Sequence, residues 1–274
     1  MSTHAEVVAD SIAPSGARLT TFVLQYPRFI HAEFLTHRMF SRNASSSRAI
    51  PVARQARMLR RAMAIPVHVG AAQPGMQAAH ELRGWRRRAA LALWQGAGLG
   101  ARATALALAR LGVHKQVANR IMEPWAHIQV VCTATDYEGF FALRCHAMAQ
   151  PEIRVLADAM RQARERSSPR PVPWGAWHLP LIHDHERAQE APLELAKMSA
   201  ARCARVSYCN HDGSRPDRAR DLALYHRLIT AVPAHASPTE HQALADPEVA
   251  ADRYVANLRG WRPFRHLPRE QAVA

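Results

Sequence analysis

The sequence predicts a mixed α/β fold built as a single domain over residues 1–274. Two segments rich in β-branched and aromatic residues, 20–26 and 126–134, are typical of strands. Longer segments carry apolar residues at helical spacing, most clearly over 138–166. The chain has 274 residues, 48% of them hydrophobic, which is enough for one sizeable core. We find no internal repeat and no linker that would divide it.

The N-terminal half is expected to begin with the strand at 20–26, which turns at Pro27 into a short helix and then a serine-rich loop. Three helices are expected to follow, at 53–64, 77–111 and 114–122. The glycines at 96 and 98 should break the second helix, because glycine is a poor helix former. Gly112 suits the end of that helix. The strand at 126–134 comes next.

The C-terminal half is expected to be mainly helical. Pro151 should either kink the helix over 138–166 or mark a boundary between two helices. A proline-rich loop over 167–190 should follow. Two further helices are expected at 192–206 and 216–232, and the tail from Pro233 should be irregular.

The chain is strongly basic, with 36 Lys and Arg residues against 22 Asp and Glu, for a formal net charge of +14. Such an excess attracts polyanions, which are either nucleic acids or small molecules that carry phosphate. We find no signal peptide and no apolar run of about 20 residues, the length that a membrane helix needs. We therefore expect a cytoplasmic protein without a membrane anchor, encoded by a bacterium or a phage.

The four cysteines form no C-x-x-C pair, so a structural zinc site is not expected. We expect buried free thiols instead. His235, Glu240 and His241 lie close together in the sequence, but no third His or Cys stands at ligand spacing, so no metal site is predicted.

The stretch from Thr36 to Arg48 is the most informative part of the chain. Its thirteen residues include three arginines, one histidine and four serines. Guanidinium groups and small hydroxyls suit a phosphate dianion, because both donate hydrogen bonds and arginine adds bidentate charge. A solvated basic loop would have the same composition, so the stretch alone leaves both interpretations open.

Three separate stretches resemble the flavin-dependent thymidylate synthases, which methylate dUMP without a cysteine nucleophile. The first, Thr36-His37-Arg38 followed by Ser46 and Arg48, is similar to the family's Arg-His-Arg hallmark. The second runs from Gly112 to Arg120, through a strand at Cys132-Thr133 to Phe140–Arg144, and on to Ala149-Gln150-Pro151-Glu152-Ile153-Arg154. The third is Ala204-Arg205-Val206-Ser207-Tyr208, followed by His235 to His241.

The order of these stretches resembles a circular permutation of the family. In the ordinary family the third stretch precedes the first, whereas here it lies near the C-terminus. The resemblance therefore implies an N-terminal motif block (20–52), a helical region (53–166), a permuted block (192–245) and a tail (246–274). It also implies a family fold with helices around a central, mostly antiparallel sheet, similar to that of phage-type variants. Permutation costs little where termini lie at the surface.

The resemblance implies an enzyme that makes dTMP from dUMP. The one-carbon donor would be 5,10-methylenetetrahydrofolate, and FAD and NADPH would supply hydride, so cofactors would carry the difficult chemistry. Family sites lie between subunits, which implies a homotetramer. No cysteine nucleophile is needed.

The resemblance also implies roles for single residues. Arg144 matches the catalytic arginine beside the pyrimidine, where it would stabilise negative charge as N3 loses its proton. Positions that match the nucleotide side are Glu33, Ser46, Ser47, Arg48, Arg120 and Arg144. Positions that match the flavin side are His37, Arg38, Ser207, His235, Ser237 and Glu240.

The sequence departs from the family's pattern at four positions. Thr36 replaces the first hallmark arginine, Ala44 replaces a usual Glu, and Glu33 replaces a usual Gln. Thr135 stands where an asparagine that contacts flavin is expected. Each change alters a polar contact worth about 1–3 kcal/mol if it is buried. The segment Asn257 to Arg262 is a candidate source of replacement contacts.

Two alternatives stay open. The protein could be a related flavin and folate enzyme that hydroxymethylates or methylates another pyrimidine nucleotide. The +14 charge also suits a basic nucleic-acid-binding protein that reuses the scaffold, with an affinity that falls steeply as salt rises.

Overall fold

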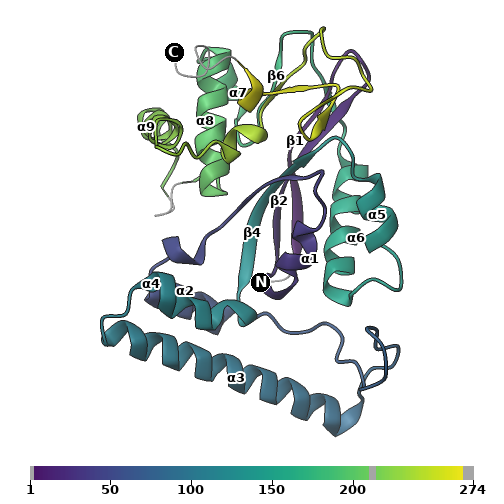
Figure 1. Ribbon diagram of the computed structural model, residues 1–274, viewed down its shortest axis with the longest axis vertical. Helices are drawn as coiled ribbons and strands as arrows, with labels where there is room; N and C mark the ends of the chain where they lie inside the picture. Colours follow the sequence, from purple (N-terminus) through teal and green to yellow (C-terminus); the bar gives the residue numbers. More distant parts are fainter. Residues whose placement is uncertain (1–2, 210–213, 268–274) are drawn as a thin grey trace.

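The computed structural model describes residues 3–209 and 214–267, and its centre is a five-stranded sheet in the order β3-β4-β2-β1-β5 (Figure 1). The strands are His4–Ile12 (β1), Arg18–Pro27 (β2), Ser41–Ala44 (β3), His127–Ala134 (β4) and Arg170–Pro171 (β5). Every neighbouring pair is antiparallel except β1 with β5. The α/β class with a mostly antiparallel sheet is therefore confirmed.

The two faces of the sheet are covered by different parts of the chain. Alternate residues of β2 and β4, such as Phe22 and Val130, are buried against helices α5 (Glu138–Arg144) and α6 (Pro151–Arg166). The intervening residues, such as Val131, pack against Cys203 and Val206 near the end of helix α8 (Pro192–Arg205). Since side chains alternate along a strand, both faces of β2 and β4 are buried.

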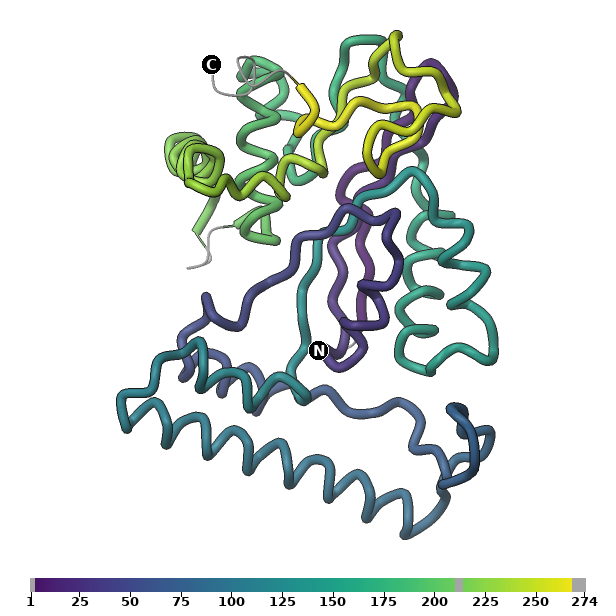
Figure 2. Tube along the Cα trace, in the orientation of Figure 1, coloured from purple at the N-terminus to yellow at the C-terminus, as the bar shows by residue number. Residues whose placement is uncertain are grey.

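A helical excursion separates the paired strands β3 and β4, as Figure 2 shows for the blue segment beneath the sheet. It contains α2 (Val52–Arg61), α3 (Gly84–Arg110), α4 (Lys115–Ala118) and the 3-10 helix η3 (Asn119–Trp125). The predicted break of α3 at its glycines is wrong. Gly98 is buried, and a Cβ there would lie 2.7 Å from Met63 Cε and 2.8 Å from Trp125 Cδ1. The glycine thus permits close packing within an unbroken helix.

The N-terminal part also contains the short helices η1 (Arg28–Ile30), α1 (His31–Leu35) and η2 (Ser47–Ala49), and the C-terminal part supplies further helices and short strands. They are β6 (Trp177–His178), α7 (Asp184–Arg187), α8, α9 (Arg218–Ile229), η4 (Ser237–Glu240), β7 (Ala243–Leu244), β8 (Tyr254–Val255), β9 (Leu258–Arg259), β10 (Arg262–Pro263) and η5 (Phe264–His266). The expected irregular tail is therefore wrong for residues 243–266. Trp261 is fully buried, and its Nε1 donates to the Ala17 carbonyl at 3.1 Å, so this segment belongs to the core. Residues 268–274 lie outside the described part.

Other differences from the sequence-based expectations are local. Strand β1 was not predicted, and β3 lies inside the expected loop. The boundary at Pro151 is real, because α5 and α6 are separate helices. The helix expected at 77–111 begins only at Gly84. Among residues 3–209 and 214–267, no helix combines the length and apolar character that crossing a membrane requires.

Candidate active site

His37 and Arg144, which lie 107 residues apart in the sequence, meet beside the core. Arg144 Nε donates a hydrogen bond to His37 Nε2 at 3.0 Å, and the His37 ring lies edge-on to Phe140 with centroids 4.7 Å apart. Burial lowers the pKa of His37 to about 4, and the charges of Arg144 and Arg42 add to the effect. His37 is therefore neutral, and its Nε2 holds Arg144 by accepting the hydrogen bond from the Arg144 Nε–H. Because Nε is used in this way, a ligand would meet the terminal amino groups of the guanidinium.

Arg42 fixes the backbone around His37. Its Nη1 donates to the carbonyl oxygens of Phe34, Leu35 and His37, at 3.3, 2.9 and 3.0 Å. These carbonyls lie at and just past the end of helix α1 (His31–Leu35), where backbone acceptors lack helical partners. Sequence reasoning did not single out Arg42, although its place in the arginine-serine stretch was a signal.

Thr36, which replaces the first arginine of the family's hallmark, makes a hydrogen bond within its own turn. Its hydroxyl donates to the Glu33 carbonyl at 2.7 Å, and its side chain is exposed. Glu33 is half-buried in α1, and Arg38 is exposed just beyond this turn. Both positions lie close in sequence to His37, on the segment that Arg42 fixes.

The predicted phosphate residues form a second group around Glu123. Ser47 donates to the Glu123 carboxylate at 2.6 Å, and Arg120 and Arg28 pair with the same carboxylate at 3.0 and 3.1 Å. The Ser46 hydroxyl accepts from the Arg48 backbone N–H at 3.3 Å, so it caps the 3-10 helix η2 (Ser47–Ala49). Glu123, which sequence reasoning missed, gathers these donors around one carboxylate.

These two groups lie on different sides of the molecule. Ser47 is tied to Asn119, next to α4, because Asn119 Nδ2 donates to the Ser47 carbonyl at 2.7 Å. Arg144 ends α5, and Figure 1 shows α4 and α5 on opposite sides of the sheet. The structure thus brings Ser47 and Arg120 together, and His37 and Arg144 together, but it does not join the two pairs within one chain.

The segment from His235 to His241 lies against β3. His235 and Ser237 are exposed, whereas Glu240 forms an ion pair with Arg265. A pocket of about 280 Å³ opens beside this pair, and its walls include Ser41 and Asn257. Of the flavin-side positions, Glu240 lines this pocket, together with Ser41 of β3 and residues of the C-terminal segment, whereas His37, Arg38, Ser207, His235 and Ser237 lie outside its lining.

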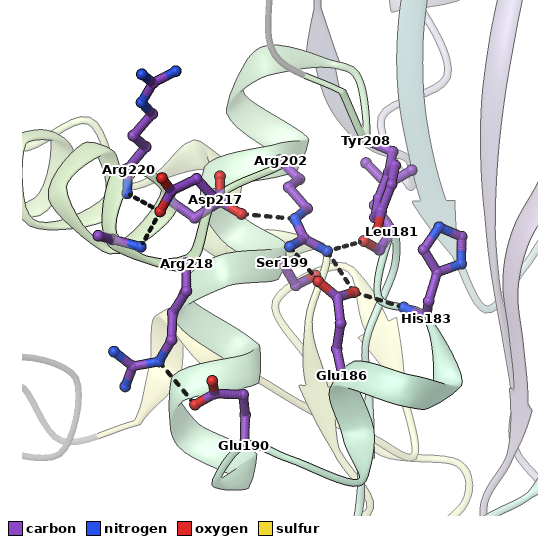
Figure 3. Close-up of polar contacts among 12 residues, drawn as sticks. Leu181, His183, Glu186, Glu190, Ser199, Arg202, Tyr208, Asp217, Arg218 and Arg220 are labelled. Atoms are coloured by element: carbon purple, nitrogen blue, oxygen red, sulfur yellow. Dashed lines mark hydrogen bonds and ion pairs between the residues drawn. The ribbon is translucent and has the colours of Figure 1, made fainter. Parts of the chain in front are cut away.

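Ser207 follows helix α8, whose last turn is held by a buried charge cluster. Arg202 is 1% exposed, makes two hydrogen bonds of 2.8 and 2.6 Å with Glu186, and one of 2.8 Å with Asp221 (Figure 3). Its guanidinium also lies 4.8 Å from the centre of the Tyr208 ring. The helix ends at Val206, which has φ of +58°. The cluster therefore fixes the backbone from which Ser207 emerges.

The segment Asn257 to Arg262 was expected to replace the polar contacts that the sequence lacks, but most of its polar and aromatic groups make other interactions. Arg259 pairs with Asp136 at 2.9 Å, Arg262 pairs with Asp246 and Glu248, and Trp261 is in the core. The Thr135 hydroxyl accepts the Arg259 backbone N–H at 3.0 Å. Thr135 therefore anchors the C-terminal segment, and Asn257 and Leu258 are the residues of that set that line the pocket.

In the described ranges, no three His, Cys, Asp or Glu side chains gather in a group that could hold a metal ion. The polar groups around His37, Ser47 and Glu240 are donors and charges that suit an anionic organic ligand.

A family model described as thymidylate synthase complementing protein, Thy1, matches residues 17–170, which is more than half of the chain. The chain belongs to this family. The match covers His37, Arg48, Arg120 and Arg144, and it ends before the 192–245 block, so the permuted order stays a prediction. No curated protein sequence matches the chain.

Solved structures of the family share the fold. One is a UMP/dUMP methylase PolB from Streptomyces cacaoi bound with 5-Br dUMP, at 16% identity and a TM-score of 0.52, covering 60% of this chain and 90% of that one. The same methylase bound with 5-Br UMP gives 18% identity, a TM-score of 0.52 and coverage of 61% and 90%. At such identities the likeness concerns the fold alone.

Proposed function

We propose that the protein transfers a one-carbon group to the uracil ring of dUMP and so makes dTMP. The observation that carries the proposal is the hydrogen bond between Arg144 and His37, which joins two motifs of the family in one preorganised pair. A neutral histidine that accepts from arginine fixes the guanidinium without competing for its charge. Preorganised charge of this kind stabilises an anion that develops during a reaction.

Arg144 is the proposed catalytic residue. Its guanidinium would lie beside the pyrimidine and stabilise the negative charge that makes C5 nucleophilic once N3 has lost its proton. His37 stays neutral at physiological pH, because its pKa is about 4. It therefore acts as an acceptor that orients Arg144 and not as a second cation.

The nucleotide phosphate is proposed to bind Ser46, Ser47, Arg48 and Arg120. An incoming dianion would compete with Glu123 for the Arg120 guanidinium and the Ser47 hydroxyl, which now point at that carboxylate. The exposed Arg48 adds positive charge. This predicts that phosphate binding separates Arg120 from Glu123.

On the motifs that the chain shares with its family, FAD is the proposed cofactor, with NADPH as reductant and 5,10-methylenetetrahydrofolate as one-carbon donor. The pocket of about 280 Å³ beside Ser41 and Glu240 is smaller than FAD and would take only part of it. His37, Arg38, Ser207, His235, Ser237 and Glu240 are the residues proposed to hold it. When bound, FAD would supply the hydride chemistry that no side chain of the chain can supply. The side chains of the protein would bind and orient the cofactor. Because Arg265 forms an ion pair with Glu240, it must either release Glu240 when the cofactor binds or remain as a positive charge beside the cofactor.

We propose that the active enzyme is a homo-oligomer, with a homotetramer as the expected form. The separation of the Ser47 group from the Arg144 group supports this, because a second copy could bring one group opposite the other. The exposed face of α3 supports it too. That face carries Ala92, Ala97 and Ala103. The one charged residue between Ala89 and Ala109 is Arg102, which is turned toward α2 and donates to the Ala56 carbonyl.

The choice of nucleotide is the least constrained part of the proposal. The structural relatives are described as UMP/dUMP methylases, so both nucleotides are candidate substrates here. The exposed Ala44, in place of a glutamate, and Glu33, in place of a glutamine, change the contacts expected on the nucleotide side. A hydroxymethyl product is the second candidate outcome.

Three measurements test the proposal. The purified protein should show bound flavin in its absorbance spectrum, and it should convert dUMP with methylenetetrahydrofolate, FAD and NADPH into a product of dTMP mass. Arg144→Lys should lower kcat by roughly a hundredfold to a thousandfold, because a preorganised donor is lost, whereas Arg161→Lys on the surface of α6 should change nothing. A colourless protein that ignores added FAD and leaves both nucleotides unchanged would refute the proposal. Salt-sensitive binding of DNA without turnover would favour the nucleic-acid alternative.

A further inference from the structure

Six polar side chains form an unbroken hydrogen-bonded chain across one face of the sheet. In order they are Ser11, His178, Thr21, Thr133, His241 and Asn43. His178 lies 2.9 Å from Ser11 Oγ through its Nδ1 and 2.8 Å from Thr21 Oγ1 through its Nε2. The two threonine hydroxyls, Thr21 and Thr133, are 2.7 Å apart. His241 lies 2.8 Å from Thr133 Oγ1 through its Nδ1 and 3.1 Å from the Asn43 amide through its Nε2. We call these residues the relay. They come from β1, β6, β2, β4, the residue after η4, and β3.

The four central residues of the relay are sealed from water, while Asn43 at its end is half-buried. Thr21, Thr133, His178 and His241 have no exposed surface. Burial lowers the pKa of His178 and of His241 to about 3. Both imidazoles are therefore neutral, and each has one donor nitrogen and one acceptor nitrogen.

The amide of Asn43 fixes the direction of every bond in the relay. The end of this amide that faces His241 also faces two backbone carbonyls, Ser237 at 3.3 Å and Arg42 at 3.2 Å. Carbonyl oxygens only accept, so the amide nitrogen must occupy this end. His241 Nε2 then accepts, and its proton must be on Nδ1.

The remaining bonds follow from this assignment. His241 Nδ1–H donates to Thr133, Thr133 donates to Thr21, and Thr21 donates to His178 Nε2. His178 Nδ1–H then donates to Ser11. The two threonine hydroxyls each donate once and accept once, so the bonds from Asn43 to Ser11 all run in a single direction.

Asn43 also joins segments that are distant in the sequence. Besides the His241 ring, its amide nitrogen lies within hydrogen-bonding distance of the backbone carbonyls of Ser237, in the flavin-side segment, and of Arg42, whose side chain fixes the carbonyl of His37, and its two hydrogens are shared among these acceptors. His37 in turn holds Arg144. The contact between the His241 ring and the Asn43 amide thus ties the segment from His235 to His241 to β3, which lies about 200 residues earlier in the chain.

We propose that Asn43, Thr133 and His241 are positioning residues, which hold the 235–241 segment in register with the His37–Arg144 pair through a directional, neutral hydrogen-bonded relay. The functional meaning of that register rests on the proposed function. The relay itself does not, and its direction can be measured without any cofactor.

The first test is the protonation pattern of the unmodified full-length protein. Long-range ¹H–¹⁵N NMR spectra distinguish the two nitrogens of each imidazole. The chain has 16 histidines, so the His178 and His241 signals are assigned by their loss in His178→Gln and His241→Gln. Both residues should carry the proton on Nδ1 at neutral pH. Any other pattern in either ring would overturn the assigned direction.

The second test removes one link and asks whether the distant segment loosens. Thr133→Val deletes the central hydroxyl but keeps the side-chain shape, and Thr20→Val is the matched control. Thr20 is equally buried on β2 but bonds Asp10 instead of the relay. Hydrogen exchange in peptides covering 235–241 should speed up by about tenfold in Thr133→Val, the change expected when one buried hydrogen bond no longer opposes local opening. Equal exchange in the two variants would overturn the positioning role.

A third measurement separates this inference from the proposed function. The FAD dissociation constant, followed by flavin fluorescence, should rise in Thr133→Val more than in Thr20→Val. If neither variant nor the unmodified protein binds FAD, the proposed function fails, while the tautomer and exchange results still decide the relay. If all three bind FAD equally although exchange differs, the relay orders the segment but does not position the site, and the proposal is overturned.

Discussion

Replacing Arg202 with leucine should lower the free energy of unfolding by about 3–5 kcal/mol, the cost of removing one partner from a buried ion pair. Arg202 satisfies two carboxylates at once, Glu186 through two hydrogen bonds and Asp221 through one. After the change, Asp221 keeps the Arg205 guanidinium. Glu186 keeps the backbone N–H of His183 at 2.9 Å and no longer meets the Arg202 charge. The cost therefore comes mainly from Glu186.

Urea denaturation at one fixed protein concentration measures this effect, because an oligomer's stability depends on concentration. Arg218→Leu is the matched control. Arg218 also pairs with two carboxylates, Glu190 and Glu194, but its side chain is 51% exposed, so its loss should cost at most about 1 kcal/mol. Adding Glu186→Leu to Arg202→Leu should recover part of the loss, because the uncompensated carboxylate is then gone.

The pH dependence provides an independent check. Burial alone would raise the pKa of Glu186, but its bonds to Arg202 and to the His183 backbone outweigh burial and hold it below the usual value. A lowered folded-state pKa contributes stability above the unfolded pKa, and this stability is lost as pH falls through the folded pKa. Arg202→Leu should therefore lose less stability on acidification than the unmodified protein. A destabilisation no larger than that of Arg218→Leu would refute the reasoning.

Three further outcomes are expected. Gly98→Ala should destabilise the protein by about 1–3 kcal/mol through overpacking, whereas Gly96→Ala, where a Cβ meets open space, should stabilise it by about 0.5–1 kcal/mol. Thermal unfolding measures both variants, and equal shifts of their Tm would contradict the packing seen around Gly98. Acidification from about pH 6.5 should progressively destabilise the fold, because the unfolded state protonates its histidines there while buried ones such as His178, with a pKa of about 3, do not; His178→Gln should flatten this dependence in urea titrations at several pH values. Ala103→Glu on α3 should lower the mass measured by light scattering if copies meet there, and Ala53→Glu on α2 should leave it unchanged.

The core strands and main helices were predictable because their patterns are regular. The segment 126–134 is rich in apolar and β-branched residues, and it forms the inner strand β4. Strand β1 was missed because its sequence, HAEVVADSI, alternates imperfectly and is only half-buried. Gly98 misled the prediction of α3, since a glycine in a helix usually signals weakness and here marks a close contact with Met63.

The residues of the site were named from family motifs, and the sequence could not say how they pair. His37 and Arg144 lie on separate elements, and only the fold brings them within 3.0 Å. Glu123 was missed because a lone glutamate near a proline carries no pattern, although it organises the arginines and the serine around it. The role of Trp261 was also missed, since a short tail with one tryptophan gives no period by which burial could be inferred.

The place at which the helical excursion joins the sheet has a consequence for how such chains can change. Strand β3 ends at Ala44 and β4 begins at His127, yet the two strands pair directly, with Ala44 opposite Val130. The chain between the two strands leaves the sheet and returns to it at the same end of this strand pair. The cost of closing a loop grows only slowly with its length. Helices can therefore be lengthened, shortened or exchanged between Ala44 and His127 while the strands keep their register. The α3 layer that we propose meets other subunits can thus evolve apart from the sheet, whereas Ser46, Ser47, Arg48 and Arg120 lie in the same excursion and must keep their places for the proposed phosphate site.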